Sequence, residues 1–444
     1  MRRVLAALTV GMLALAGCGN SDGEAESTTT AAESDSTVGG GEAVPVVAPG
    51  VTDTEIRVGG VASVTNPLGG SYGNAFEGVK AYFEMVNSEG GVHGRKLVLA
   101  QERDDKVSGN KAEIEALISA EGDQAVFAIL PVASLLFTGA DSAVAAGIPT
   151  FGWTINPEWE GTADNPKANL FGQTGSFLGF DLPGQGTPWL ANELGAEQIG
   201  VLAYSVPQSA LCADGVSNSF ETYADGTDAE VVFEDKALSY GETNLSVQVS
   251  KMKDEGVDLV LTCMDTNGVV TLAREMKKQA LDAKLYLPNG YDDSLVEEFG
   301  DLFEGSYVRT DFAGWHLPED EQPDGLKNFL EWTEKAGVAP SENAIAGWLN
   351  ADLFVEGLKA AGPNFDRQKL IDAINAMTDY KADGIIHNVD WTRQHTQRDD
   401  PDKGCDFKSI VEDSELVPAF TEPGKPFHCV DGSDPANLEP VNEP

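Results

Sequence analysis

Residues 56–100 read IRVGGVASVTNPLGGSYGNAFEGVKAYFEMVNSEGGVHGRKLVLA, and this stretch decides the fold. It opens on residues 56–61, a mostly apolar run that predicts a strand. Apolar residues then recur from Tyr72 to Val86 at roughly the 3.6-residue spacing of an amphipathic helix. Residues 96–100 are strand-like again. A strand, a helix and a second strand in this order predict a parallel β-α-β unit with a right-handed crossover.

The same alternation continues along the chain. Residues 125–130, AVFAIL, are a continuous apolar run, as expected for a parallel strand that is covered on both faces. A helix from Ser134 to Ala146 and a strand from Ile148 to Phe151 follow. Later strands are predicted at residues 199–204, 231–233, 258–262 and 284–287. Two runs of β-α units predict an α/β chain with two Rossmann-like, doubly wound lobes.

The N-terminus has the features of an export signal. Basic Arg2 and Arg3 precede residues 4–16, an apolar run too short to span a bilayer. Leu15-Ala16-Gly17-Cys18 resembles the lipobox of bacterial lipoproteins, where the signal is removed before a cysteine whose sulfur carries a diacylglycerol. We therefore expect a signal peptide over residues 1–17 and a lipid on Cys18 that holds the chain at the outer face of the cell membrane. An ordinary signal peptide with a chance cysteine is the alternative.

The composition of the chain indicates which residues fold and argues against one class of partner. Residues 19–48 are polar and lack aromatic residues, so we expect a disordered tether over residues 18–50. The folded body is expected over residues 51–430, followed by a polar tail. The net charge of −43 argues against nucleic acid as a partner, because the phosphate backbone would repel the chain.

Four cysteines remain after Cys18, namely Cys212, Cys263, Cys405 and Cys429. An even number in an exported chain predicts two disulfides, for which three connectivities are possible. We favour Cys212–Cys263 and Cys405–Cys429, because each pair lies within one region of the sequence. A metal site is the competing use, but the chain has no Cys-x-x-Cys motif. We predict neither a metal nor a cofactor.

An enzymatic function has little support in the sequence. Residues 69–73, GGSYG, match the Gly-x-Ser-x-Gly nucleophile motif, but that motif needs its serine on a sharp strand-to-helix turn. Here Thr65 to Gly70 intervene after the strand. Asp104 and Asp105 form a carboxylate pair in a loop, where a structural role is more common than a catalytic one. No phosphate-binding motif follows a strand. We predict that the chain has no catalytic residues.

A binding cleft is better supported, because ligands of open α/β sheets bind beyond the carboxyl ends of the strands. Ser134 follows one strand and is expected to cap the next helix, whose free N–H groups suit a carboxylate. Asp265 follows another strand and is expected to pair with an ammonium group; a helix N-cap is the alternative role. The full set of expected ligand-binding residues is Ser71, Ser134, Leu135, Trp153, Phe177, Tyr204, Asp265 and Thr266.

Several stretches together resemble the type I periplasmic solute-binding proteins of the leucine/isoleucine/valine-binding group. They are residues 69–87, the segment GGVHGRKL at 90–97, Asp104-Asp105, residues 125–134 and Gly147-Ile148-Pro149. The resemblance implies a monomeric receptor that delivers small amphipathic solutes, such as amino acids or amides, to an ABC permease. It also implies two lobes that close over the ligand about three crossovers.

This resemblance places the crossovers near residues 171–174, 307–311 and 386–389. It divides the chain into a first lobe of residues 51–173 and 310–386, a second lobe of residues 174–309 and 387–430, and a tail of residues 431–444. The turn at residues 130–135, LPVASL, has one hydroxyl where the family carries two adjacent ones. Specificity for branched-chain amino acids is therefore not predicted. The alternative function is a ligand-sensing or enzyme-like lipoprotein that uses the same cleft.

Overall fold

The computed structural model describes residues 44–176, 179–395, 404–430 and 432–441. The expected signal peptide, Cys18, most of the expected tether and Phe177 lie outside the described residues. None of the helices within these ranges is long and apolar enough to cross a membrane.

The first sheet is built from the N-terminal part of the chain, and all of its strands run parallel. Its spatial order is β2-β1-β3-β4-β5. The strands are β1 (Glu55–Ala62), β2 (Lys96–Asp104), β3 (Ala128–Ala133), β4 (Thr150–Gly152) and β5 (Leu170–Gly172). β3 begins three residues later than the strand predicted at residues 125–130, and every residue of it is buried, as expected for a parallel strand covered on both faces.

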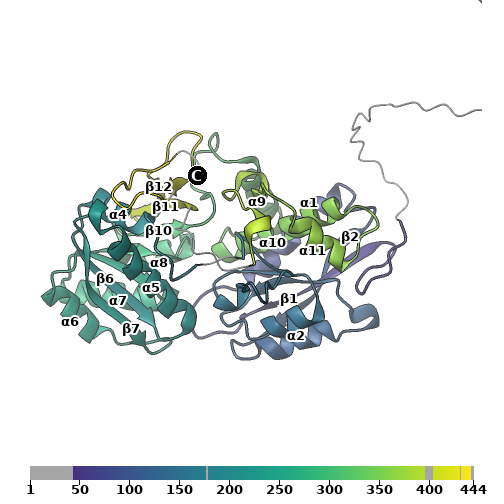
Figure 1. Cartoon of the computed structure of the whole chain (residues 1–444), viewed down its shortest axis with the longest axis horizontal. Coiled ribbons are helices and arrows are strands. Elements are labelled where there is room, and N and C mark those ends of the chain that lie inside the picture. The colour runs from purple at the N-terminus through teal and green to yellow at the C-terminus, as the bar shows by residue number, and fades with distance from the viewer. Residues whose placement is uncertain (1–43, 177–178, 396–403, 431, 442–444) are drawn as a thin grey trace, which may run out of the picture. The chain divides into compact units, whose positions relative to one another are not determined.

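Helices from two distant parts of the sequence cover this sheet. They are α1 (Asn74–Ser88), α2 (Asn110–Ile118), α3 (Ala140–Ala146), α9 (Asp324–Ala336), α10 (Glu342–Ala361) and α11 (Arg367–Ile374). Figure 1 shows α1, α10 and α11 on one side of β1 and α2 on the other. Helices α1 and α10 touch at Gly78 and Gly347, where an added Cβ would lie about 2 Å from a backbone carbonyl oxygen of the other helix. Glycine at both positions therefore permits this close crossing.

The second sheet has the order β12-β11-β10-β9-β8-β6-β7, and β13 pairs with β11. The strands are β6 (Gln198–Tyr204), β7 (Glu230–Leu238), β8 (Leu259–Cys263), β9 (Lys284–Leu287), β10 (Tyr307–Thr310), β11 (Gly404–Glu412), β12 (Glu415–Ala419) and β13 (His428–Val430). The pairs from β7 to β10 are parallel, whereas β11 pairs antiparallel with β10, β12 and β13. The parallel part, β7-β6-β8-β9-β10, repeats the strand order of the first sheet.

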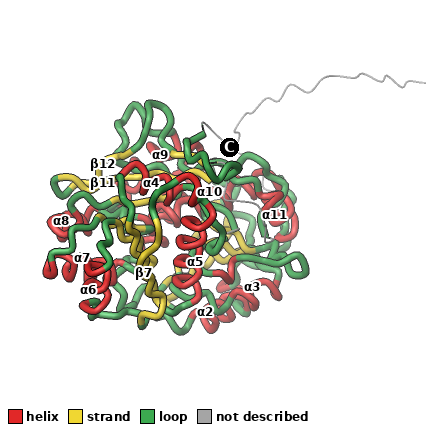
Figure 2. Tube along the Cα trace, turned by 60° about the vertical axis from the view of Figure 1, so that its left-hand side comes forward, coloured by secondary structure: helices red, strands yellow, loops and turns green. Residues whose placement is uncertain are grey.

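The helices of the second lobe lie on both faces of its sheet. They are α4 (Gly186–Leu194), α5 (Pro207–Thr222), α6 (Ser246–Asp254), α7 (Thr266–Gln279) and α8 (Asp293–Phe303). Figure 2 shows α5 on one side of β7 and the row of α6, α7 and α8 on the other. The predicted fold class, two doubly wound α/β lobes, is therefore confirmed.

The chain passes between the two sheets three times. It leaves the first sheet after β5, returns to the first lobe after β10 as helices α9 to α11, and enters the second sheet again at β11. Phe312 and Ile386, on two of these connections, form an antiparallel bridge. Residues 387–395, assigned above to the second lobe, contact the first lobe here, since the Trp391 ring packs at 5.4 Å on Phe171. The exact lobe boundaries remain a prediction.

One predicted helix is wrong at its start. The sequence predicts a helix from Ser134, but α3 begins at Ala140 and Gly139 is its N-cap residue. Residues 134–139 form a loop that the hydrophobic pattern does not distinguish from a first helical turn, because Leu135 and Phe137 are buried in it. Ser134 therefore does not cap the helix that follows.

Candidate ligand-binding site

A cavity of about 280 Å³ lies where the carboxyl ends of the two parallel sheets meet. In each sheet, the order of the strands changes direction next to its first strand, β1 or β6. This switch point is where open α/β sheets bind ligands. The cavity is lined mainly by apolar and aromatic side chains, with a few polar groups. The lining residues used below are Tyr72, Leu135, Trp153, Thr154, Tyr204, Gln208, Tyr240, Asp265, Arg309, Asp311 and Glu342.

Hydrogen bonds and a disulfide at the ends of β6 and β8 stabilise the part of the cavity wall that the second lobe contributes. Ser209 accepts a 2.7 Å hydrogen bond from the backbone N–H of Tyr204 and donates to the carbonyl oxygen of Cys263. The structure contains a Cys212–Cys263 disulfide, which joins α5 to the end of β8. These contacts fix the positions of Tyr204 and Asp265.

Asp265 is both a helix cap and a cavity residue. Its Oδ1 atom accepts a 2.9 Å hydrogen bond from the backbone N–H of Gly268, so it caps α7. Its side chain lines the cavity although the residue is only 9% exposed. Among the described residues, neither Asp265 Oδ2 nor the Tyr204 hydroxyl has a hydrogen-bond partner of good geometry. Burial raises the pKa of Asp265 above its ordinary value, although the hydrogen bond from Gly268 opposes this shift.

Four aromatic rings line the same cavity as this carboxyl group. The rings of Tyr204 and Tyr240 meet edge to face with their centroids 5.5 Å apart. The ring centroids of Tyr72 and Trp153 are also 5.5 Å apart. Burial raises the pKa of all three tyrosines, with Tyr240 at about 12, and the negative charge of Asp265 adds to each shift. The charge of Asp265 therefore acts on all three phenol groups of this cavity wall.

The wall from the first lobe includes Leu135, Trp153 and Thr154. The backbone N–H of Leu135 donates to Ser63 Oγ at 3.1 Å. The backbone N–H of Thr154 donates to Gln173 Oε1 at 2.9 Å. Both strand-end donors are thus already bonded within the protein.

Ser134 does not line the cavity. It is 1% exposed, and its Oγ atom accepts a 2.9 Å hydrogen bond from Asn110 Nδ2. Asn110 also donates to Asp105, whose carboxylate accepts from Ser63. This buried network holds the strand ends of the first lobe. It also gives Asp105 the structural role that the sequence favoured.

The remaining expected site residues have different positions. Leu135, Trp153, Tyr204 and Asp265 line the cavity, whereas Ser71 and Thr266 are not among its lining residues. Ser71 is exposed in the long loop between β1 and α1. Phe177 lies outside the described residues.

Among the described residues, contacts made by Gln208, Asn267 and Glu342 join the lobes around the cavity. Gln208 Nε2 donates to the carbonyl oxygen of Leu135 at 3.3 Å. Asn267, in the first turn of α7, donates to the carbonyl oxygen of Pro67 at 3.3 Å. Gly69 has a φ of +97°, and a Cβ there would lie 2.7 Å from Asn267 Oδ1, so glycine lets the two lobes approach at this point.

Glu342 makes the third contact. It is the first residue of α10 and accepts backbone hydrogen bonds from Gly290 and Tyr291, in the loop after β9, at 2.9 and 2.6 Å. The residue is partly buried in the cavity wall, and this burial raises the pKa of its carboxyl group to about 7.

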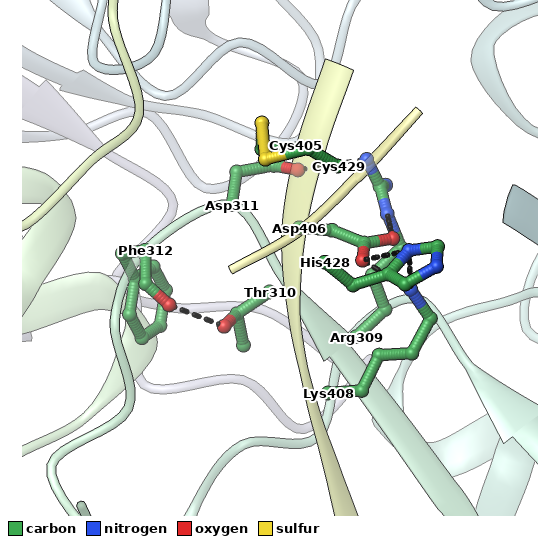
Figure 3. Close-up of polar contacts among 9 residues, drawn as sticks. All are labelled: Arg309, Thr310, Asp311, Phe312, Cys405, Asp406, Lys408, His428 and Cys429. Atoms are coloured by element: carbon green, nitrogen blue, oxygen red, sulfur yellow. Dashed lines mark hydrogen bonds and ion pairs between the residues drawn. A yellow bond between two sulfur atoms is a disulfide. The ribbon is translucent and has the colours of Figure 1, made fainter. Parts of the chain in front are cut away.

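A buried charge cluster lies beside the cavity in the second lobe (Figure 3). Asp406 is ion-paired with Lys408, whose side chain is fully buried, and with Arg309 Nε at 3.0 Å. Arg309 also pairs with Asp311 at 2.8 Å. Burial and the charge of Lys408 lower the pKa of His428 to about 4, so this ring is neutral at neutral pH.

This cluster borders a second, more polar cavity of about 690 Å³. We take the smaller cavity as the site because it joins the strand ends of both lobes. Cys405 and Cys429 lie by the larger cavity and form a disulfide. Their sulfur atoms and His387 lie within 4.8 Å of one another, but sulfurs bonded in a disulfide are not thiolate ligands. Within the described residues, no other such grouping of possible metal ligands occurs.

Sequence reasoning missed Tyr72, Tyr240, Arg309 and Glu342. Tyr240 follows the end of β7, so the strand-end rule could have found it. The apolar spacing predicts Tyr72 on the buried face of a helix, but α1 begins only at Asn74. Glu342 carries no local signal, because it reaches the cavity from a helix far along the chain.

Comparisons with known proteins agree with this architecture. A family model described as "Periplasmic binding protein" matches residues 55–401. The "Leu/Ile/Val-binding protein homolog 8" of Brucella abortus is 23% identical over 337 residues, which cover 73% of this chain and 80% of that protein.

Two solved structures show the same fold. The fatty acid ABC transporter substrate-binding protein from Thermomonospora curvata has a TM-score of 0.67 at 20% identity, with 88% of this chain and 95% of that chain covered. An ABC transporter solute-binding protein from R. palustris in complex with 4-hydroxybenzoate has a TM-score of 0.63 at 19% identity, with 82% and 95% covered.

The family match spans most of the chain, including all residues that line the cavity, and ends before β11. It is a family of binding proteins, which agrees with the expectation that the chain is not an enzyme. The resemblance to leucine/isoleucine/valine-binding proteins extends to a distant relative, but structures with other ligands share the fold equally well. On the family match, the chain belongs to the periplasmic binding proteins.

Proposed function

We propose that this chain is the solute receptor of an ABC importer. It captures a small amphipathic solute between its two lobes and presents it to a permease outside the cytoplasm. The observation that carries the proposal is the cavity of about 280 Å³ at the switch points of both sheets, lined by residues of both lobes. A ligand that contacts both walls favours the closed arrangement, because only differential affinity shifts such an equilibrium. The names of the relatives support a transport role.

The receptor is held at the membrane by a lipid on Cys18, as the sequence of the N-terminus suggests. The expected solutes are small molecules with an apolar body and a polar group, since aromatic side chains dominate the cavity wall. Amino acids and amides are the classes that the sequence suggested.

The proposal is tested by uptake in cells. Cells that lack the gene are expected to lose uptake of the solute that the purified chain binds, and the wild-type gene should restore it. Gln208→Leu, which removes an interlobe hydrogen bond, should restore uptake less well than Gln368→Leu, a matched change on the exposed face of α11. Binding should also compact the protein in small-angle X-ray scattering. Unchanged uptake and unchanged scattering with saturating solute would refute the receptor function.

A further inference from the structure

The charge of the solute can be inferred from what the cavity leaves unpaired. Asp265 is nine-tenths buried and lines the cavity, and its Oδ2 atom makes no well-aligned hydrogen bond with the described residues, although the Tyr204 hydroxyl lies close enough to oppose the rise of its pKa. A buried, ionised carboxylate is costly unless an opposite charge or hydrogen bonds compensate it. The described part of the chain supplies no ion pair to Asp265. Its raised pKa has the same cause, which is burial.

The surroundings of Asp265 suit a cation in a second way. Tyr72, Tyr204, Tyr240 and Trp153 line the same cavity. The faces of aromatic rings carry negative partial charge, so a ring that faces a cation attracts it, most strongly where water is excluded. A carboxylate that shares a cavity with four aromatic side chains therefore favours a compact organic cation over an inorganic ion, which would need more oxygen ligands.

The backbone groups and the serine hydroxyl that were expected to hold an acid are already engaged. The strand-end N–H groups of Leu135 and Thr154 donate to Ser63 and Gln173. The N-terminus of α7, which could attract an anion, is capped by Asp265 itself. The hydroxyl of Ser134 lies outside the cavity and accepts from Asn110.

The remaining charges of the cavity wall are also unfavourable to an acid. Glu342 and Asp311 add two carboxyl groups to that of Asp265. Arg309 is the basic residue among those that line the cavity, and it is ion-paired with Asp311 and Asp406. The wall therefore has an excess of negative charge when its carboxyl groups are ionised.

We propose that the solute is a small organic cation, an amine or alkylammonium compound without a carboxylate, held by Asp265 among the rings of Tyr72, Tyr204 and Tyr240. This inference rests on the proposed receptor function and names the chemistry of its solute. The cation supplies the opposite charge that Asp265 needs, and the apolar body of the solute contacts Trp153 and Leu135. Closure of the lobes over the solute removes the cation and the carboxylate from water.

The test uses probes that share a skeleton and differ in charge. Calorimetric titration at pH 7 compares benzylamine and benzyltrimethylammonium with benzamide, benzoate and phenylalanine. A second series compares butylamine with butyramide, butyrate and leucine. At least one cation should bind, with a Kd at least tenfold lower than those of the neutral, anionic and zwitterionic members of its series.

Two variants locate the charge and the rings. Asp265→Asn keeps an oxygen for the N–H of Gly268 but removes the charge, so cation affinity should fall about ten- to a hundredfold. Asp366→Asn, the same change at the cap of α11, is the matched control and should leave affinity unchanged. Tyr240→Leu, at a partly exposed position, should weaken cation binding about two- to thirtyfold. This variant also serves if Asp265→Asn does not fold.

The outcomes separate this inference from the receptor function. If an acid, amide or amino acid binds more tightly than the cations and also compacts the chain, the proposed cationic solute is wrong and the proposed receptor function is retained. An unchanged cation Kd in folded Asp265→Asn, or in Tyr240→Leu if the first variant does not fold, overturns the assigned site. Absence of binding by every member of both series counts against both proposals.

Discussion

The Oε1 atom of Glu342 lies 2.6 Å from the backbone nitrogen of Tyr291 and accepts its N–H across the boundary between the lobes. The pKa of this carboxyl group is raised from 4.5 to about 7. The folded chain therefore keeps a proton that the unfolded chain releases between these two pH values. Stability falls as the pH rises through this window and is lowest, on this account, above pH 7.

Glu342→Gln should therefore stabilise the chain at high pH. Glutamine keeps an acceptor oxygen for the backbone N–H groups of Gly290 and Tyr291, but it is uncharged and so avoids the cost of burying a carboxylate in the cavity wall. We expect a gain of about 1–3 kcal/mol at pH 8 and little change near pH 4.5, measured by urea unfolding without solute. Glu331→Gln, on the exposed face of α9, is the control and should change stability by less than about 0.5 kcal/mol. A loss of stability at pH 8 would contradict the argument.

Asp406→Asn should destabilise the second lobe. Burial alone would raise the pKa of Asp406, but Lys408 and Arg309 hold it below its ordinary value. The carboxylate therefore stabilises the fold at neutral pH, and this stabilisation is lost as the pH falls through the lowered pKa. Without its anion, the fully buried Lys408 is left without its main charge partner, at a cost of about 3–5 kcal/mol in urea unfolding at pH 7. The double variant Asp406→Asn/Lys408→Met should recover most of this loss, and a double variant no more stable than the single one would argue against the pair.

The two disulfides should differ in their effect on binding. Replacing Cys212 and Cys263 by alanine opens a loop of 51 residues and should cost about 4 kcal/mol of stability. It should also weaken solute binding, because the bridge fixes the strand end that precedes Asp265. Replacing Cys405 and Cys429 opens a loop of 24 residues and should cost about 3 kcal/mol with the solute Kd nearly unchanged. Equal effects of the two double variants on Kd would show that the first bridge has no special role at the site.

Ser134→Ala distinguishes the structural role of this residue from the ligand contact that its sequence position suggested. The variant removes the acceptor of the Asn110 side chain in a buried network, so stability should fall by about 1–2 kcal/mol. The solute Kd should stay within about twofold of the wild-type value if the fold is intact. A tenfold loss of affinity at unchanged stability would restore the role as a ligand contact.

Cys18→Ala tests the lipid anchor. If the sulfur carries a lipid, the variant should leave the membrane pellet and appear in the soluble or secreted fraction, because a polar chain without acyl groups has little affinity for a bilayer. Immunoblots of fractionated cells measure this. A variant that sediments with membranes as the parent does would place the anchor elsewhere.

The fold was predictable because it follows from short apolar runs and helical spacing, which are local properties of the chain. Strands such as residues 125–130 and the helix after Tyr72 were found in this way. The rule that ligands bind beyond strand ends then located Leu135, Tyr204 and Asp265 at the cavity.

The rest of the site depends on contacts between residues distant in sequence. The sequence predicts Ser134 as a helix cap, but the partner of its hydroxyl, Asn110, lies 24 residues earlier. Glu342 reaches the loop at Tyr291 from 51 residues away. No pattern along the chain records such pairs, so only the folded arrangement reveals them.

The packing of α1 against α10 has a consequence for the order of events during synthesis. Gly78 is made early, but the helix that it touches, at Gly347, is made only after the strands β6 to β10 of the other lobe. The first lobe cannot complete its core until the central part of the second has emerged, so the N-terminal third of the chain waits with an apolar helix face uncovered. Such late, long-range contacts slow folding and expose surfaces that aggregate. We therefore expect chains truncated before α10 to be insoluble rather than to form a stable first lobe.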